Sequence, residues 1–128
     1  MHENQNAALI VQAVFEVHVR LGPGLLESVY EDALCYELDQ MGLVFERQLP
    51  IPVVYKSIEL GEGFRADLMV GNNVIVELKS LEALHPVHYK QTLTYLRLTE
   101  RRLGLLVNFG EALIKDGIKR IVNGLTDD

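Results

Sequence analysis

The chain has 128 residues, 48% of them hydrophobic, which suits one domain (residues 1–128) with a hydrophobic core. No run approaches the ~20 apolar residues of a membrane span, and the N-terminus does not read as a signal peptide. The net charge of −6 argues against a basic protein that binds nucleic acid tightly regardless of sequence.

Two helices are predicted at the start of the chain. Apolar residues recur at helical spacing over residues 4–20, and the segment Leu21–Gly24, with two glycines and a proline, ends that helix. His18 lies beside the apolar stripe, and we interpret it as a hydrogen-bonded core histidine. The second helix runs from about residue 25 to residue 41 and ends at Gly42.

Two residues of the second predicted helix bear on function. Glu27 stands one turn before Tyr30 on the apolar stripe. The helix N-terminus would favour a carboxylate there, or the side chain could point into a site, which is the interpretation we favour. Cys35 has apolar neighbours and is interpreted as a core residue. A chain with one cysteine forms no internal disulfide, which fits a reducing, cytoplasmic location.

An extended region follows the helices. Residues 44–55 are predicted to be a strand, and Pro50 and Pro52 confine it to a sheet edge or a bend. Residues 57–60 are predicted to form a short strand. Gly61–Gly63 is then predicted to turn the chain into a hairpin.

That hairpin is the most informative part of the sequence. Residues 65–70 and 74–79 are apolar-rich runs separated by Gly71–Asn73, and a three-residue loop would place Asp67 opposite Glu77. Side chains alternate across a strand. One face therefore carries Arg65, Asp67, Glu77 and Lys79, and the other carries Ala66, Leu68, Val70, Val74, Val76 and Leu78.

Two carboxylates directly opposite each other destabilise a sheet, and two interpretations follow. In the first, a hard divalent cation such as Mg²⁺ binds Asp67 and Glu77, with the main-chain carbonyl of Leu78 as a further ligand. Lys79 would then orient or activate water, or neutralise developing charge. In the second, the face is solvated and carries two ion pairs, Arg65 with Glu77 and Asp67 with Lys79.

A third helix, about Pro86–Thr99, is predicted to open at His85-Pro86. Gln91 and Tyr95 are four residues apart and share one of its faces. His85 and His88 have no third ligand nearby in the sequence, and we interpret them as surface residues.

The C-terminal part is predicted to complete a sheet. Residues 103–109 form a continuous apolar run, typical of a strand buried on both faces, and should lie parallel to residues 74–79 in a βαβ unit. Asp116-Gly117 predicts a turn before a short edge strand at residues 118–122, and residues 126–128 are expected to fray. Arg97, Arg101 and Arg102 could contact phosphates, but we favour a role at the helix C-terminus.

This order of elements, αα-βββ-α-β, resembles the core of the PD-(D/E)XK nuclease superfamily, a restriction-endonuclease-like α/β fold with a central mixed sheet flanked by helices. The signature reads Asp67, nine residues, then Glu77-Leu78-Lys79, with Ala66 in place of the proline. The segment GLLESVY, residues 24–30, is similar to the motif that names the GxxExxY protein family. The segments RADLMV, VELKS, YLRLT and LLVNFG extend this similarity along the chain.

The resemblance implies roles for individual residues. Asp67 and Glu77 would be the principal metal ligands, Glu27 the acidic residue that the first helix of the superfamily core sends toward the metal, and Lys79 the catalytic lysine. Gln91 and Tyr95 look like the Gln-x-x-x-Tyr element of RecB-like and phage-type exonucleases, which helps to hold DNA. Tyr30 is expected to pack the helix.

The leading functional prediction is a Mg²⁺- or Mn²⁺-dependent nuclease with DNA as the expected substrate. The alternative is a non-catalytic module of the same fold that binds nucleic acid or protein, including as a homo-oligomer. Small size and acidic charge favour the module. The presence of Glu27, Asp67 and Glu77 together with Lys79 favours the enzyme.

Overall fold

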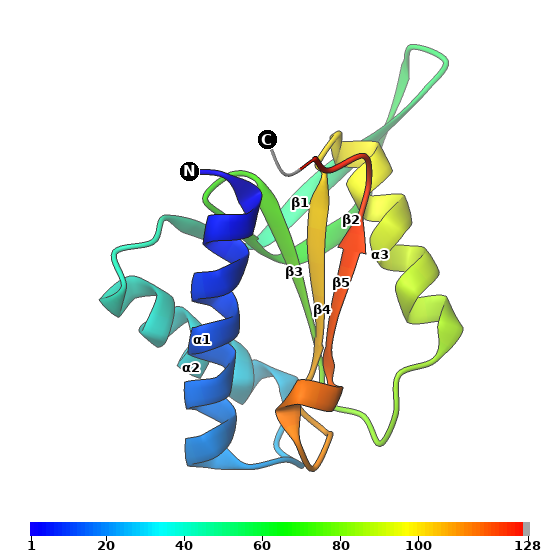
Figure 1. Cartoon of the computed structure of the whole chain (residues 1–128). Helices are drawn as coiled ribbons and strands as arrows, with labels where there is room; N and C mark the ends of the chain where they lie inside the picture. The colour runs from blue at the N-terminus through cyan, green and yellow to red at the C-terminus, as the bar shows by residue number, and fades with distance from the viewer. Residues whose placement is uncertain (127–128) are drawn as a thin grey trace.

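A computed structural model describes residues 1–126 (Figure 1). Two helices, α1 (Glu3–Leu21) and α2 (Glu27–Gln40), precede three strands, β1 (Phe45–Tyr55), β2 (Ile58–Val70) and β3 (Val74–Lys79). Helix α3 (Pro86–Thr99) connects β3 to β4 (Leu103–Asn108), and a short 3₁₀ helix, η1 (Ile114–Asp116), precedes β5 (Ile118–Val122). The expectation for the last three residues falls mostly outside the described part.

The five strands form one mixed sheet in the order β1-β2-β3-β4-β5. Strands β3 and β4 are parallel, as the predicted βαβ unit requires, and the other neighbours are antiparallel. The predicted order αα-βββ-α-β and the mixed sheet flanked by helices are confirmed, with β5 as the additional edge strand.

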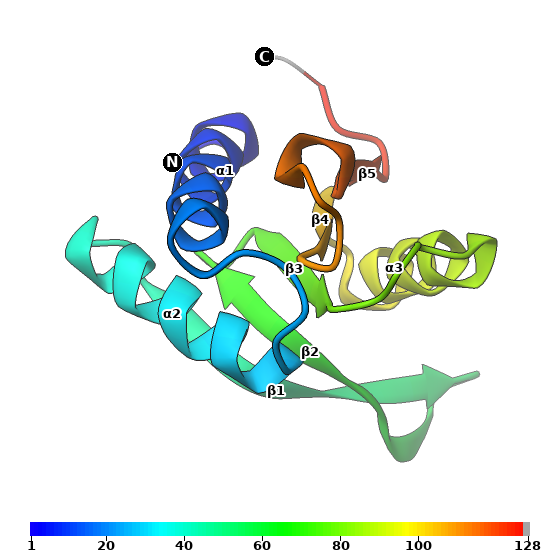
Figure 2. The same ribbon diagram turned by 90° about the horizontal axis from the view of Figure 1, so that it is seen from below.

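Helices cover both faces of the sheet (Figure 2). Helices α1 and α2 pack on one face, where their apolar stripes meet the inward side chains of β2, β3 and β4 in the larger core cluster. Helix α3 packs on the other face through Leu96, which belongs to a smaller cluster with Ile51, Ala66, Met69 and Ile75. Strict alternation predicted that Ala66 shares a face with Leu68 and Val70. This prediction is wrong, because Ala66 belongs to the cluster under α3 while Leu68 and Val70 belong to the larger cluster.

The predicted turn at Gly61–Gly63 is wrong. Strand β2 runs without interruption from Ile58 to Val70, and the chain reverses at Lys56 and Ser57, both with positive φ. The pairing of β1 with β2 is irregular near Pro52, which lies opposite Glu62, between the two glycines. A β-carbon at Gly63 would lie 2.0 Å from Cγ2 of Val53, so this glycine permits close strand approach.

The far end of the β1–β2 hairpin extends beyond the body of the molecule (Figure 1). Large apolar side chains on it, those of Val54, Tyr55, Ile58 and Leu60, are each more than half exposed. In residues 1–126 no helix is long and apolar enough to cross a membrane.

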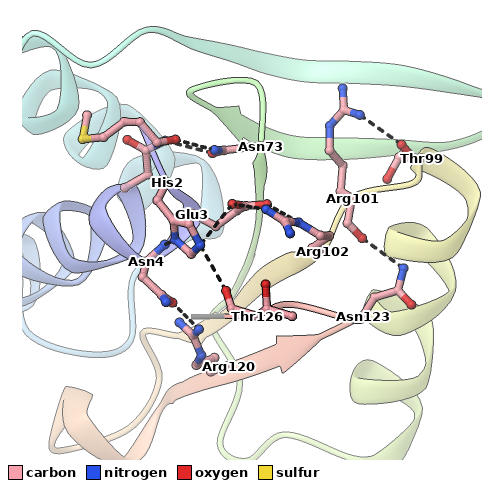
Figure 3. A network of polar contacts seen from close by, with 12 residues as sticks. His2, Glu3, Asn4, Asn73, Thr99, Arg101, Arg102, Arg120, Asn123 and Thr126 are labelled. Atoms are coloured by element: carbon pink, nitrogen blue, oxygen red, sulfur yellow. Dashed lines mark hydrogen bonds and ion pairs between the residues drawn. The ribbon is translucent and has the colours of Figure 1, made fainter. Parts of the chain in front are cut away.

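A polar network ties the N-terminus to the ends of the sheet (Figure 3). Arg102 donates to both carboxylate oxygens of Glu3, through Nε at 2.8 Å and Nη2 at 2.9 Å. Arg101 donates to the main-chain oxygen of Thr99 and to the side chain of Asn72. Arg101 and Arg102 are therefore engaged in structural contacts at the end of the molecule where β4 begins.

Two predicted core residues are confirmed. His18 is 8% exposed, and its Nε2 lies 2.9 Å from the main-chain oxygen of Glu111. Cys35 is buried, and burial raises the pKa of its thiol to about 11, which keeps it in the unreactive thiol form at neutral pH.

Candidate functional site

The acidic residues lie where β2 and β3 stop pairing. The predicted pairing of Val70 with Val74 is present, but the backbone ladder ends at Leu68 and Val76, before Asp67 and Glu77. Beyond that point, hydrogen bonds from main-chain amides to carboxylate side chains take the place of the main-chain bonds between the two strands. The amide of Asp67 donates to Oε2 of Glu77 at 3.2 Å, and the amide of Leu78 donates to Oδ2 of Asp67 at 2.8 Å.

Two cavities meet at Asp67. The larger has a volume of about 450 Å³ and is lined by Glu27, Ser28, Glu31, Gln48, Asp67 and Leu78. The smaller has a volume of about 110 Å³ and is lined by Arg65, Asp67, Glu77, Lys79, His88, Gln91, Thr92 and Tyr95. Asp67 is thus shared, while Glu27 belongs to one cavity and Glu77 to the other.

Glu77 occupies an unfavourable position for a carboxylate. It is only 6% exposed, and burial, followed by the charge of Asp67, raises the pKa of Glu77 from an ordinary 4.5 to about 9. Without a further cation, Glu77 therefore holds a proton at neutral pH. The predicted electrostatic conflict between the two carboxylates is present in the folded chain.

The ion pairs that would have explained this face as a solvated surface are not formed. The guanidinium of Arg65 pairs with Glu62, at 3.0 and 3.2 Å, and no ion pair joins Asp67 to Lys79 within residues 1–126. Lys79 is half-buried and shares the smaller cavity with both carboxylates. This leaves its ammonium available for a ligand.

Helix α3 supplies the opposite wall of the smaller cavity. Gln91 and Tyr95 both line it, as expected for residues on one helical face, and Tyr95 stacks on Phe64 of β2 with ring centroids 3.8 Å apart. The main-chain amide of His85 donates to Nδ1 of His88 at 2.9 Å. Burial, and then the charge of Lys79, lowers the pKa of His88, which therefore favours its neutral form.

Glu27 is positioned by the turn that precedes α2. Tyr30 is fully buried and stacks on Phe109, with ring centroids 4.3 Å apart, which confirms its packing role. Its hydroxyl donates to the main-chain oxygen of Gly22 at 2.5 Å and accepts from the amide of Leu25 at 3.1 Å. Tyr30 thus holds the turn that sets Glu27 at the start of the helix, exposed at the rim of the larger cavity.

The sequence prediction missed Glu31 and Gln48, which line the larger cavity, and Arg47, which binds Glu31. Glu31 is 9% exposed and accepts from Nε and Nη2 of Arg47 at 3.1 and 2.8 Å. Gln48 donates to Oε1 of Glu31 at 2.6 Å and to Oδ1 of Asp67 at 3.4 Å. One available signal was the position of Glu31 four residues after Glu27, which places both on one face of α2.

The donor set suits a hard divalent cation. Asp67 and Glu77 supply carboxylate oxygens, Leu78 lines the larger cavity, and Mg²⁺ is commonly held by one or two carboxylates with water completing its coordination. In the described residues, no group of three or more His, Cys, Asp or Glu side chains is arranged to hold a metal. The predicted cluster of Glu27, Asp67 and Glu77 is therefore divided between two adjoining cavities.

A mixed sheet between helices, with Asp67 and Glu-x-Lys on adjoining strands, defines a restriction-endonuclease-like α/β protein. A scan against protein families matches the PD-(D/E)XK nuclease superfamily over residues 4–121, and the chain belongs to that superfamily. A search of curated proteins and a search of solved structures each found no match.

Proposed function

We propose that this protein is a Mg²⁺- or Mn²⁺-dependent nuclease that hydrolyses phosphodiester bonds, with DNA as its substrate. The observation that carries the proposal is the contact of Asp67 with the buried Glu77 beside Lys79, because the two carboxyl groups need a proton or a cation to be stable together. Superfamily membership supports the same chemistry. Within the superfamily, we assign the chain to the GxxExxY family on residues 24–30.

The residues would share the work as follows. Asp67 and Glu77 would hold the cation, the Leu78 carbonyl would offer a third oxygen, and Glu27 would reach it directly or through water. The bound cation would lower the pKa of water and polarise a phosphoryl oxygen. Lys79 orients the attacking water or stabilises the negative charge that develops on the phosphate.

Helix α3 would hold the nucleic acid. The side chain of Gln91 is exposed at the mouth of the smaller cavity and can donate to phosphate or base oxygens. Tyr95 has its ring fixed against Phe64, so its hydroxyl end is the part left to meet a ligand. The net charge of −6 supports only weak affinity without the cation. The single buried cysteine also fits a reducing, cytoplasmic location.

Lys79→Ala tests the assignment. Circular DNA, linear duplex DNA, single-stranded DNA and RNA are offered to purified protein with Mg²⁺, Mn²⁺ or chelator. We expect cleavage that requires the metal and falls at least ~100-fold in Lys79→Ala, the usual cost of losing a group that stabilises transition-state charge. Lys115→Ala is the matched control, because Lys115 is exposed on η1 away from both cavities.

Two results would contradict the proposal. If Lys79→Ala cleaves as fast as wild type, the lysine has no catalytic role. If wild type binds nucleic acid but cleaves none of the four substrates with either metal, the chain is a non-catalytic module. Calorimetric titration with Mn²⁺ separates these cases further, since a binding module need not take up the ion.

A further inference from the structure

Gln48 is the most unusual residue beside the candidate site. Its φ is 48°, in the left-handed region that non-glycine residues seldom adopt. The other non-glycine residues of the described chain with positive φ are Lys56, Ser57, Asn72 and Glu100, and they lie in the two hairpin turns and at the end of α3. Gln48 instead lies inside strand β1, where regular pairing would give an extended backbone.

The strained backbone coincides with a gap in the sheet. Strand β1 pairs Arg47 with Leu68 and Leu49 with Ala66, while the intervening Gln48 and Asp67 fall outside the ladder. Asp67 is also beyond the last pair that β2 forms with β3. The Asp67 carboxylate is therefore held by the main-chain amide of Leu78 on β3 and by the side chain of Gln48 on β1.

The contacts of Gln48 connect Asp67 to Glu31, a carboxylate that is itself held by Arg47. Its amide nitrogen donates to Oε1 of Glu31 at 2.6 Å and to Oδ1 of Asp67 at 3.4 Å. Both partners are carboxylates, which can only accept when ionised, so the amide nitrogen must face them. Arg47 pairs with both Glu31 and Asp32, and its two bonds to Glu31 hold that carboxylate in place as a support for Gln48.

The two carboxylate oxygens of Asp67 accept hydrogen bonds of different length. Oδ2 accepts a short bond from the amide of Leu78, at 2.8 Å, whereas Oδ1 accepts the long bond from Gln48. The short bond from the Leu78 amide anchors the carboxylate, and the weak bond of 3.4 Å from Gln48 is a second contact that sets its rotation while leaving Oδ1 able to bind a cation. Backbone strain of this kind is found where surrounding structure holds a functional group in place.

We propose that Gln48 is a positioning residue that orients the Asp67 carboxylate for cation binding, with the Arg47–Glu31 pair as its anchor. The inference rests on the proposed function, because it assumes that Asp67 holds the cation. It assigns a role to strand β1 that neither the Asp and Glu-x-Lys signature nor residues 24–30 contain. Residues that orient metal ligands typically contribute 10–100-fold to metal affinity.

The test measures Mn²⁺ affinity by calorimetry and does not depend on cleavage. Gln48→Leu removes the donor, and we expect Mn²⁺ to bind about 10–100-fold more weakly. Gln48→Gly removes the donor and also relieves the left-handed strain, so it should weaken Mn²⁺ binding equally while unfolding at no lower temperature than Gln48→Leu. Gln40→Leu, at the exposed end of α2, is the matched control and should bind Mn²⁺ like wild type.

The outcomes separate this inference from the proposed function. If wild type binds Mn²⁺ and both Gln48 variants bind it equally well, Gln48 serves only the fold and the inference is wrong, although the nuclease proposal stands. If wild type takes up no Mn²⁺, both proposals fail. If Gln48→Leu does not fold, Gln48→Gly decides the matter, since glycine adopts the required φ without strain.

Discussion

Glu3 and Glu77 are each 6% exposed, yet their surroundings shift the pKa values of the two carboxyls in opposite directions, because Glu3 is paired with Arg102 and Glu77 lies deeper in the protein. At the N-terminal network, the hydrogen bonds from Arg102 lower the pKa of Glu3 (Figure 3). At the β2–β3 junction, burial and the charge of Asp67 raise the pKa of Glu77 to about 9. One carboxylate is neutralised by a partner within the chain, and the other needs a proton or a cation.

The difference separates a carboxylate that is paired within the chain from one that has no ion pair in residues 1–126. A buried charge is stable only when it is paired, and the Glu3–Arg102 contact supplies both the opposite charge and the two hydrogen bonds. Asp67 and Glu77 have the hydrogen bonds but form no ion pair in residues 1–126, and the nearby charge of Lys79 lowers the Glu77 pKa less than burial and Asp67 raise it. This imbalance supports the proposal that a cation binds at the hairpin and not at the N-terminal network.

Glu77→Gln gives the largest expected change in stability. With chelator present, the raised pKa means that the folded state keeps a proton that the unfolded state loses, so wild-type stability should decline between pH 4.5 and about 9. Glutamine does not ionise, and the variant should be more stable by on the order of 2–4 kcal/mol near pH 8, with little difference near pH 4. Urea unfolding across this pH range measures the difference.

Mn²⁺ supplies the control for that experiment. The ion should raise the stability of wild type at pH 8 and have a smaller effect on Glu77→Gln, since a neutral amide is a weaker ligand. A wild-type protein whose stability rises steadily from pH 5 to pH 9 without metal would show that Glu77 is not held in its protonated form.

The parts of the fold and of the candidate site that the sequence predicted correctly are those marked by local patterns. The bounds of α3, Pro86–Thr99, were predicted correctly, because Pro86 favours the first turn and the apolar repeat marks the length. The opposition of Asp67 and Glu77 followed from strand alternation and the short loop. Those signals are local, and local signals are what a single sequence contains.

The remainder of the site depends on contacts between distant segments. Gly61–Gly63 was misjudged because glycine serves turns and close strand packing alike, and only the approach of Val53 distinguishes the two. Gln48 reaches Glu31 and Asp67, which are 17 and 19 residues away. The division of the acidic residues between two cavities also depends on how α2 meets the sheet, which no periodic pattern encodes.

Asp67→Asn tests how much the charge of Asp67 raises the Glu77 pKa, and its expected effect is smaller than that of Glu77→Gln. Removing the Asp67 charge should lower the Glu77 pKa from about 9, yet leave it above 4.5, because burial is the larger cause. Carboxyl ¹³C NMR titration with chelator present measures the change. An unaltered Glu77 pKa would show that Asp67 contributes nothing, and a return to 4.5 would show that burial is not the main cause.

Glu3→Gln should have the smallest effect and the opposite dependence on pH. A lowered pKa means that the unfolded state binds a proton more readily, so the Glu3–Arg102 pair stabilises the fold above the ordinary carboxyl pKa and loses this contribution as pH falls through the folded value. The variant should therefore be slightly less stable than wild type at pH 7 and nearly equal to it at low pH. The contribution is modest because the Arg102 side chain is 44% exposed and solvent screens the pair. Thermal unfolding at the two pH values, with Glu77→Gln measured alongside, compares the two ends directly. If both variants shifted stability with the same sign at pH 7, the two carboxylates would not be balanced in the opposite ways that their surroundings indicate.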